Sequence, residues 1–94
     1  MDLLITVKEI KGNCPTYKLG DSFTLKKGYQ LISDIPVCMH GLAALMPFYN
    51  ALRVSEPRRW GLAGKENAKA YVQCPDAVSH TGGGTVIFEI SKKD

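Results

Sequence analysis

The hydrophobic and polar positions along the chain predict four β-strands and two short helices. Apolar and polar side chains alternate over residues 3–10, where Ile5 and Val7 share one face. A period of two is typical of a strand with one buried face. The same alternation predicts three further strands, over residues 22–25, 68–73 and 85–90.

Residues 33–53, between the second and third predicted strands, follow a helical period instead. Their apolar positions recur at steps of three and four residues and form one stripe: Leu42, Leu45, Met46, Tyr49 and Leu52. Pro36 suits the first turn of a helix. Pro47 interrupts the stripe, because proline cannot donate a backbone hydrogen bond and clashes with the preceding turn. The pattern therefore predicts two helices, over residues 36–46 and 47–54.

This order of elements defines the expected fold class. Two strands, then helices, then two strands favour an α+β fold with a small antiparallel sheet of about four strands. One or two helices would cover one face of the sheet. The 94 residues are enough for one domain, so residues 1–94 are expected to form a single domain.

Composition and charge limit the classes of function. The chain is 45% apolar and 22% charged, which is ordinary for a soluble globular domain. No apolar run reaches the ~18 residues of a membrane span, and the first residues lack the pattern of a signal peptide. We expect a cytoplasmic protein without membrane contact. The net charge of +3 is too small to indicate nucleic-acid binding.

The three cysteines, Cys14, Cys38 and Cys74, are the candidate functional residues. Two of them precede a proline, as Cys14-Pro15 and Cys74-Pro75. Proline disfavours helical geometry in the residue before it, so both thiols are expected on extended turns beside strand ends. Cys38 falls in the first turn of the predicted helix, where free backbone N–H groups favour a thiolate. Strand ends and a helix start can converge at one end of a small domain, so we expect the three sulfurs to meet.

Three thiolates that meet would select zinc, copper(I) or an iron–sulfur cluster. A structural zinc site needs four ligands, and His40 and Asp76 are the nearest candidates for the fourth. A cubane [4Fe–4S] cluster held by three cysteines leaves one iron open to another ligand or to a substrate. An iron–sulfur cluster is therefore the expected cofactor, with a role in electron transfer or in chemistry at the exposed iron. Zinc, or no cofactor, is the alternative.

Two other interpretations of the cysteines stay open. Their spacings of 24 and 36 residues match no standard metal motif, and isolated cysteines also serve as small buried hydrophobes. The chain would then be a cofactor-free binding or assembly module. A cysteine nucleophile is the third interpretation, but Cys38 and His40 face apart on a helix. His80 would have to approach from the glycine-rich loop that contains residues 82–84.

Partners are less well defined by the sequence. A second copy of this chain and a redox partner protein are the candidates. Arg58, Arg59 and Trp60 form a small basic and aromatic group, which is typical of an oligomer contact or of a solvated face.

Three blocks of residues carry a resemblance to a known family. They are Val7–Gly12 with Cys14-Pro15 and Gly20-Asp21-x-Phe23; Cys38 with Leu45-x-Pro47 and Ala51–Arg53; and Cys74-Pro75-Asp76 with Val86-x-Phe88-Glu89-Ile90. Together they resemble a family of short uncharacterised prokaryotic proteins, common in anaerobes, over nearly the whole chain. The resemblance implies a stand-alone small domain in which the three cysteines occupy signature positions. This chain departs from the family in residues 77–84, which form a longer and more glycine-rich loop.

Overall fold

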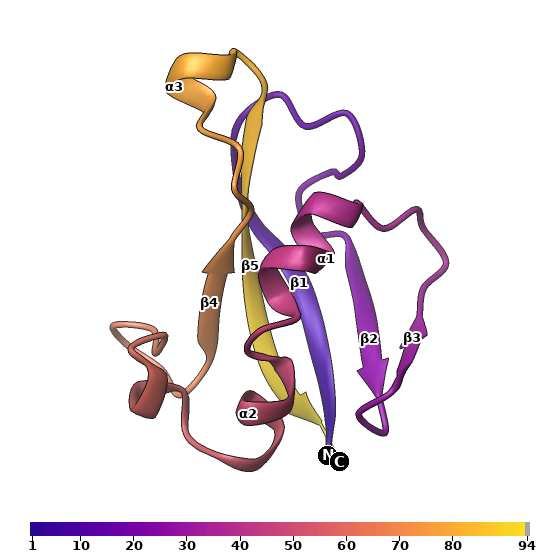
Figure 1. The fold of residues 1–94 in the computed structure, drawn as a ribbon, viewed down its shortest axis with the longest axis vertical. Helices are drawn as coiled ribbons and strands as arrows, with labels where there is room; N and C mark the ends of the chain where they lie inside the picture. Colours follow the sequence, from indigo (N-terminus) through magenta and orange to yellow (C-terminus); the bar gives the residue numbers. More distant parts are fainter. Residues whose placement is uncertain (94) are drawn as a thin grey trace.

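The computed structural model describes residues 1–93 and is built on a five-stranded antiparallel sheet (Figure 1). The strands are β1 (Asp2–Gly12), β2 (Ser22–Lys26), β3 (Gln30–Ile32), β4 (Ala70–Gln73) and β5 (Gly84–Lys93). Their order across the sheet is β3-β2-β1-β5-β4. The two long strands, β1 and β5, therefore lie side by side at the centre, and the short strands β3 and β4 form the edges.

Among residues 1–93, the central strand pair supplies five of the seven largest fully buried side chains. Ile5 pairs with Ile90 and Val7 with Phe88, and these side chains alternate onto the buried face of the sheet. The register shifts between Val7 and Glu9, where β1 carries a bulge. A bulge bends a strand and re-aims the residues beyond it, and the last part of β1 leads into the loop that contains Cys14.

Two helices cover this buried face, α1 (Met39–Leu45) and α2 (Tyr49–Val54), and Figure 1 shows both in front of the sheet. Leu45 of α1 and Leu52 of α2 are each only 1% exposed, so the predicted apolar stripe does face the core. A 3₁₀ turn η1 (Pro57–Trp60) and a one-turn helix α3 (Val78–Thr81) complete the elements. The α+β fold class predicted from the sequence is confirmed.

Several details of the prediction need correction. The first helix begins at Met39 and not at residue 36, because Ser33 and Ile35 hydrogen-bond to each other in an irregular segment that leads into the helix. Pro36 thus lies outside the helix. The second helix begins at Tyr49 and not at Pro47. Strand β3 was missed, because its three residues are all exposed and give no pattern of burial.

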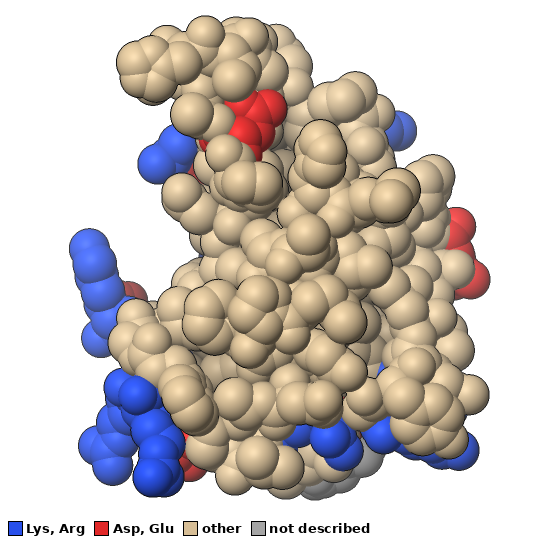
Figure 2. Space-filling model, in the orientation of Figure 1, with Lys and Arg blue, Asp and Glu red and all other residues tan. Residues whose placement is uncertain are grey.

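Charge is unevenly distributed over the molecule. Figure 2 shows the Lys and Arg side chains gathered mainly at the end that carries α2, η1 and the chain termini, whereas the half over α1 and α3 carries few. Among residues 1–93, no helix is long and apolar enough to cross a membrane.

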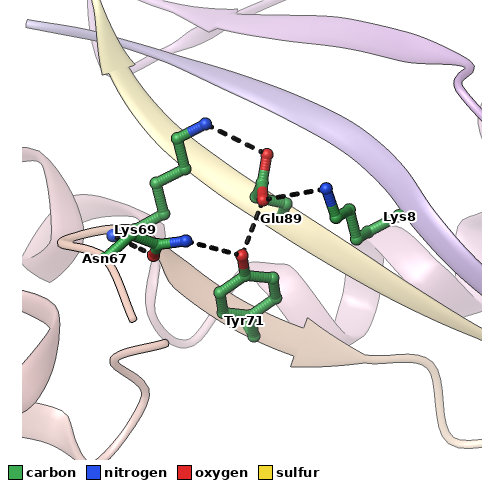
Figure 3. A network of polar contacts seen from close by, with 5 residues as sticks. All are labelled: Lys8, Asn67, Lys69, Tyr71 and Glu89. Carbon is green, nitrogen blue, oxygen red and sulfur yellow. Dashed lines mark hydrogen bonds and ion pairs between the residues drawn. The ribbon is translucent and has the colours of Figure 1, made fainter. Parts of the chain in front are cut away.

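A polar network lies on the sheet face opposite the helices (Figure 3). Glu89 of β5 is only 8% exposed. Its carboxylate accepts a hydrogen bond from the Tyr71 hydroxyl at 2.6 Å and pairs with Lys69 at 3.3 Å and Lys8 at 3.7 Å. The bond from Tyr71 is the largest influence that lowers the pKa of Glu89; burial opposes it, and the two lysines add to it. The network ties β4, β5 and β1 together on the uncovered face.

Candidate functional site

A pocket of about 380 Å³ lies at the end of the sheet that carries α3, away from the chain termini. Cys14, Cys38 and Cys74 all line it, together with Tyr17, His40 and Asp76. The volume is within the ~300–1,000 Å³ range of small-molecule sites in proteins. Three cysteines that are far apart in the sequence thus border a single cavity.

Two chain segments, the one after β1 and the one before β5, lie side by side at this end (Figure 1), and both contribute residues to the pocket lining. The Asn13 N–H donates to the Gly83 carbonyl at 3.1 Å and joins the segment after β1 to the segment before β5. Gly12 has a φ of +83°, and a Cβ there would collide with the Gly83 carbonyl oxygen. Only glycine is compatible with both that backbone geometry and that close approach. The pairing places the Cys14 segment beside the start of β5, and Cys74 is held to the same strand by its hydrogen bonds with Val86.

Cys14 lies in the segment that joins β1 to β2 and is half-buried. Its Sγ accepts a hydrogen bond from the backbone N–H of Tyr17 at 3.4 Å. The turn that begins at Cys14-Pro15 therefore folds back so that a backbone donor faces the sulfur. Such a donor occupies one acceptor position of the sulfur.

Cys38 is the residue immediately before α1 and is also half-buried. Its backbone is extended (φ −69°, ψ 127°), and its side chain makes no hydrogen bond that caps the helix. Sequence reasoning placed Cys38 within the first turn, and the structure places it one residue earlier. Its backbone N–H donates to the phenolic oxygen of Tyr17 at 2.9 Å. The sulfur is therefore not used to cap the helix.

Cys74 directly follows β4 and is the most buried of the three, at 7% exposure. Its Sγ accepts the N–H of Val86 at 3.2 Å and lies 3.7 Å from the Gly84 carbonyl oxygen. Its own N–H donates to the Val86 carbonyl at 2.9 Å, which continues the pairing with β5. Backbone N–H groups thus face the sulfurs of both Cys-Pro cysteines.

The other two sequence candidates in the pocket play different parts. His40 is exposed, on the second residue of α1, and lines the pocket. Asp76 accepts hydrogen bonds from the Thr81 hydroxyl and from the Gly84 N–H at 3.2 Å, so its carboxylate already shapes the loop. The His40 side chain, in contrast, takes no part in these loop hydrogen bonds.

The nucleophile interpretation gains little support from this arrangement. Among residues 1–93, no hydrogen bond joins a cysteine sulfur to His40 or His80. His80 lies on α3 and does not line the cysteine pocket. An activated cysteine needs a base within hydrogen-bond reach.

The charge of the lining indicates what kind of ligand the pocket suits. Three thiols and one carboxylate line it, and none of the described lining residues is Lys or Arg. Such a donor set suits a soft cation and disfavours an anionic ligand.

The spacing of the donors limits which metal centre would fit. Within the described part of the chain, no three His, Cys, Asp or Glu side chains are grouped so that they could hold a metal ion together. A single zinc needs its ligands around one centre, and the side chains as they stand do not supply that. The three thiols are soft donors of the kind that iron–sulfur clusters use, and the described side chains as they stand form no single-ion site.

Tyr17 is the residue of this site that sequence reasoning missed. It is 4% exposed, and its two ends contact Cys14 and Cys38. Burial is the main reason that its pKa is raised above the ordinary value of 10.0; the bond from Cys38 opposes this, and the nearby thiols and Asp21 add to it. The available signal was the position of Tyr17 three residues after Cys14, the spacing of a tight turn.

Comparison with protein-family models, with curated proteins and with solved structures found no match for this chain.

Proposed function

We propose that this chain is a small iron–sulfur protein in which Cys14, Cys38 and Cys74 ligate the cluster. One observation carries the proposal: the three cysteines come from three separate segments of the chain and line one cavity whose described lining contains no Lys or Arg. Thiolates are the ligands that iron–sulfur clusters use. When bound, the cluster would supply electron transfer or a Lewis-acidic iron.

The chain's own residues would prepare the thiols for this role. The N–H groups of Tyr17 and Val86 donate to the sulfurs of Cys14 and Cys74. Hydrogen bonds to cluster ligands tune the reduction potential. Three protein ligands leave a fourth position, and His40 or an external ligand would fill it. Zinc is the less favoured alternative, because of the donor spacing described above.

The proposed function also implies a cellular location and partner proteins. Reduced thiols and a cluster fit a cytoplasmic location, and electron transfer requires a redox partner protein. A second copy of the chain is the other partner that we propose, since a domain of this size buries only a small core on its own.

Elemental analysis of freshly made protein tests the proposal. The chain is purified without oxygen, and iron, acid-labile sulfide and zinc are measured per chain. We expect a brown protein with broad visible absorption and about three or four irons per chain. A colourless protein without iron or zinc after anaerobic purification and anaerobic reconstitution would contradict the proposal.

A cofactor-free binding or assembly module is the second candidate, and an exposed apolar edge favours it. Leu31 and Ile32 of the edge strand β3 are 39% and 53% exposed, and the adjacent Tyr29 is 76% exposed. Unpaired edge strands with apolar side chains are typical sites of strand addition. A concentration-dependent mass in sedimentation, abolished by Ile32→Lys and unaffected by loss of metal, would support this candidate over the first.

A further inference from the structure

Tyr17 contacts two of the three cysteines through opposite ends of the same residue. Its backbone N–H donates to Cys14 Sγ at 3.4 Å, and its phenolic oxygen accepts from the Cys38 N–H at 2.9 Å. Cys14 lies on a loop and Cys38 at a helix start, so no regular element joins them directly. Tyr17 is therefore the connection between these two pocket residues.

The ring of Tyr17 is held rigidly by the core of the sheet. It stacks on Phe23 of β2, with 6.4 Å between ring centroids and 12° between planes, and meets Phe88 of β5 edge-on at 5.7 Å. Both phenylalanines are almost fully buried. Because aromatic rings packed in this way have little freedom, Tyr17 fixes the loop and the helix start with respect to the sheet.

The hydroxyl of Tyr17 also keeps an unused hydrogen. It accepts the Cys38 N–H, and within residues 1–93 it donates to no protein acceptor. A phenol both donates and accepts, and Tyr17 lines the cysteine pocket.

We propose that Tyr17 is the positioning residue of this site: it fixes Cys38 relative to Cys14 and presents its phenolic hydrogen to the centre that the thiols bind. This inference rests on the proposed function for its second part only. The first part concerns the chain alone and is testable without any metal.

The variant Tyr17→Phe tests the positioning role, because it keeps the ring and removes only the hydroxyl. The metal-free, reduced protein is treated with iodoacetamide, and modification of each cysteine is followed by mass spectrometry. Loss of one hydrogen bond predicts about a fivefold faster reaction at Cys38. Cys14 keeps its bond to the Tyr17 N–H and serves as an internal reference, with an expected change of less than about twofold.

The matched control is Tyr49→Phe. Tyr49 donates its hydroxyl to the Gly28 carbonyl at 3.0 Å and does not line the cysteine pocket. Tyr49→Phe should leave all three rates within about twofold of wild type, since it removes a tyrosine hydroxyl and its one hydrogen bond outside the pocket. An unchanged Cys38 rate in Tyr17→Phe, or an equal rise at all three cysteines, would overturn the positioning role.

The metal-loaded protein tests whether Tyr17 presents its phenolic hydrogen to the bound centre. In Tyr17→Phe we expect a shifted visible spectrum and about fivefold faster loss of iron to a chelator, whereas Tyr49→Phe should match wild type in both. An identical spectrum and rate in Tyr17→Phe would overturn this part. If wild-type protein binds no metal at all, the proposed function is contradicted, and the alkylation comparison alone decides whether Tyr17 positions Cys38.

Discussion

Gly41 packs directly on the ring of Phe88: a Cβ atom at Gly41 would lie 2.8 Å from Phe88 Cζ. Gly41 is in the first turn of α1, three residues after Cys38, and Phe88 is fully buried in the central strand β5. A side chain at this point would push the helix start away from the sheet. Because Gly41 has no side chain, the start of α1 can lie close to the sheet. This close approach helps to set the position of Cys38 at the pocket.

Replacing Gly41 tests this contact. Gly41→Ala should lower the free energy of unfolding by about 1–3 kcal/mol, measured by urea denaturation, because the added methyl overpacks a rigid core. Intrinsic helix propensity works in the opposite direction and favours Ala over Gly by ~1 kcal/mol. The sign of the change thus decides between the two effects, and a net stabilisation would contradict the close contact. Ala43→Ser, on the exposed side of the same helix, is the control and should change stability by less than about 0.5 kcal/mol.

Asp76 is expected to shape the loop and not to ligate metal. Asp76→Ala removes the acceptor for the Thr81 hydroxyl and the Gly84 N–H. It should lower the unfolding free energy by about 1–3 kcal/mol, as loss of charge-assisted hydrogen bonds does. Asp34→Ala, at an exposed residue in the segment before α1, is the control. The opposite pattern, with unchanged stability and complete loss of metal in Asp76→Ala, would make Asp76 a ligand.

The lowered pKa of Glu89 predicts how the stability of the folded protein depends on pH. Its pKa in the folded protein lies below the ordinary value of 4.5, mainly because Tyr71 donates a hydrogen bond to it. A lowered carboxylate pKa stabilises the folded state above the unfolded pKa, and that stability is lost as pH falls through the folded pKa. Wild-type stability should therefore fall as the pH drops below about 4.5, and Glu89→Gln should lose less over the same range.

Urea denaturation at several pH values measures this difference. Glu9→Gln, at an exposed carboxylate on β1, is the control and should follow the wild-type curve. In Tyr71→Phe the loss should be smaller and should end at a higher pH, because the largest cause of the lowered pKa has been removed. Parallel curves for wild type and Glu89→Gln would show that the network in Figure 3 does not hold the carboxylate ionised.

The sequence allowed the fold to be predicted where burial follows a regular period. The alternation around Ile5 and Val7 and the helical stripe through Leu45 and Leu52 are both present in the structure. Elements without a one-sided burial pattern were missed: β3 is exposed throughout, and α3 is a single turn with no buried residue.

Prediction of the candidate site from the sequence was also limited to features with a local pattern. The Cys-Pro pairs pointed to Cys14 and Cys74, and the helix start pointed to Cys38, because local backbone rules apply to each of them. Tyr17 could not be found in this way. Its role depends on a hydrogen bond to a residue 21 positions away and on packing between two strands. Contacts of that kind appear only when the chain is folded.

Metal content in single cysteine variants is the most direct test of the central claim that three thiols form one site. Cys14→Ser, Cys38→Ser and Cys74→Ser are purified anaerobically beside wild type and Met39→Leu, which alters an exposed sulfur next to Cys38. The account predicts that each serine variant loses most of its iron and melts at a lower temperature, because metal binding contributes to folding free energy, while Met39→Leu matches wild type. Retention of full iron by any one of the three serine variants would contradict it.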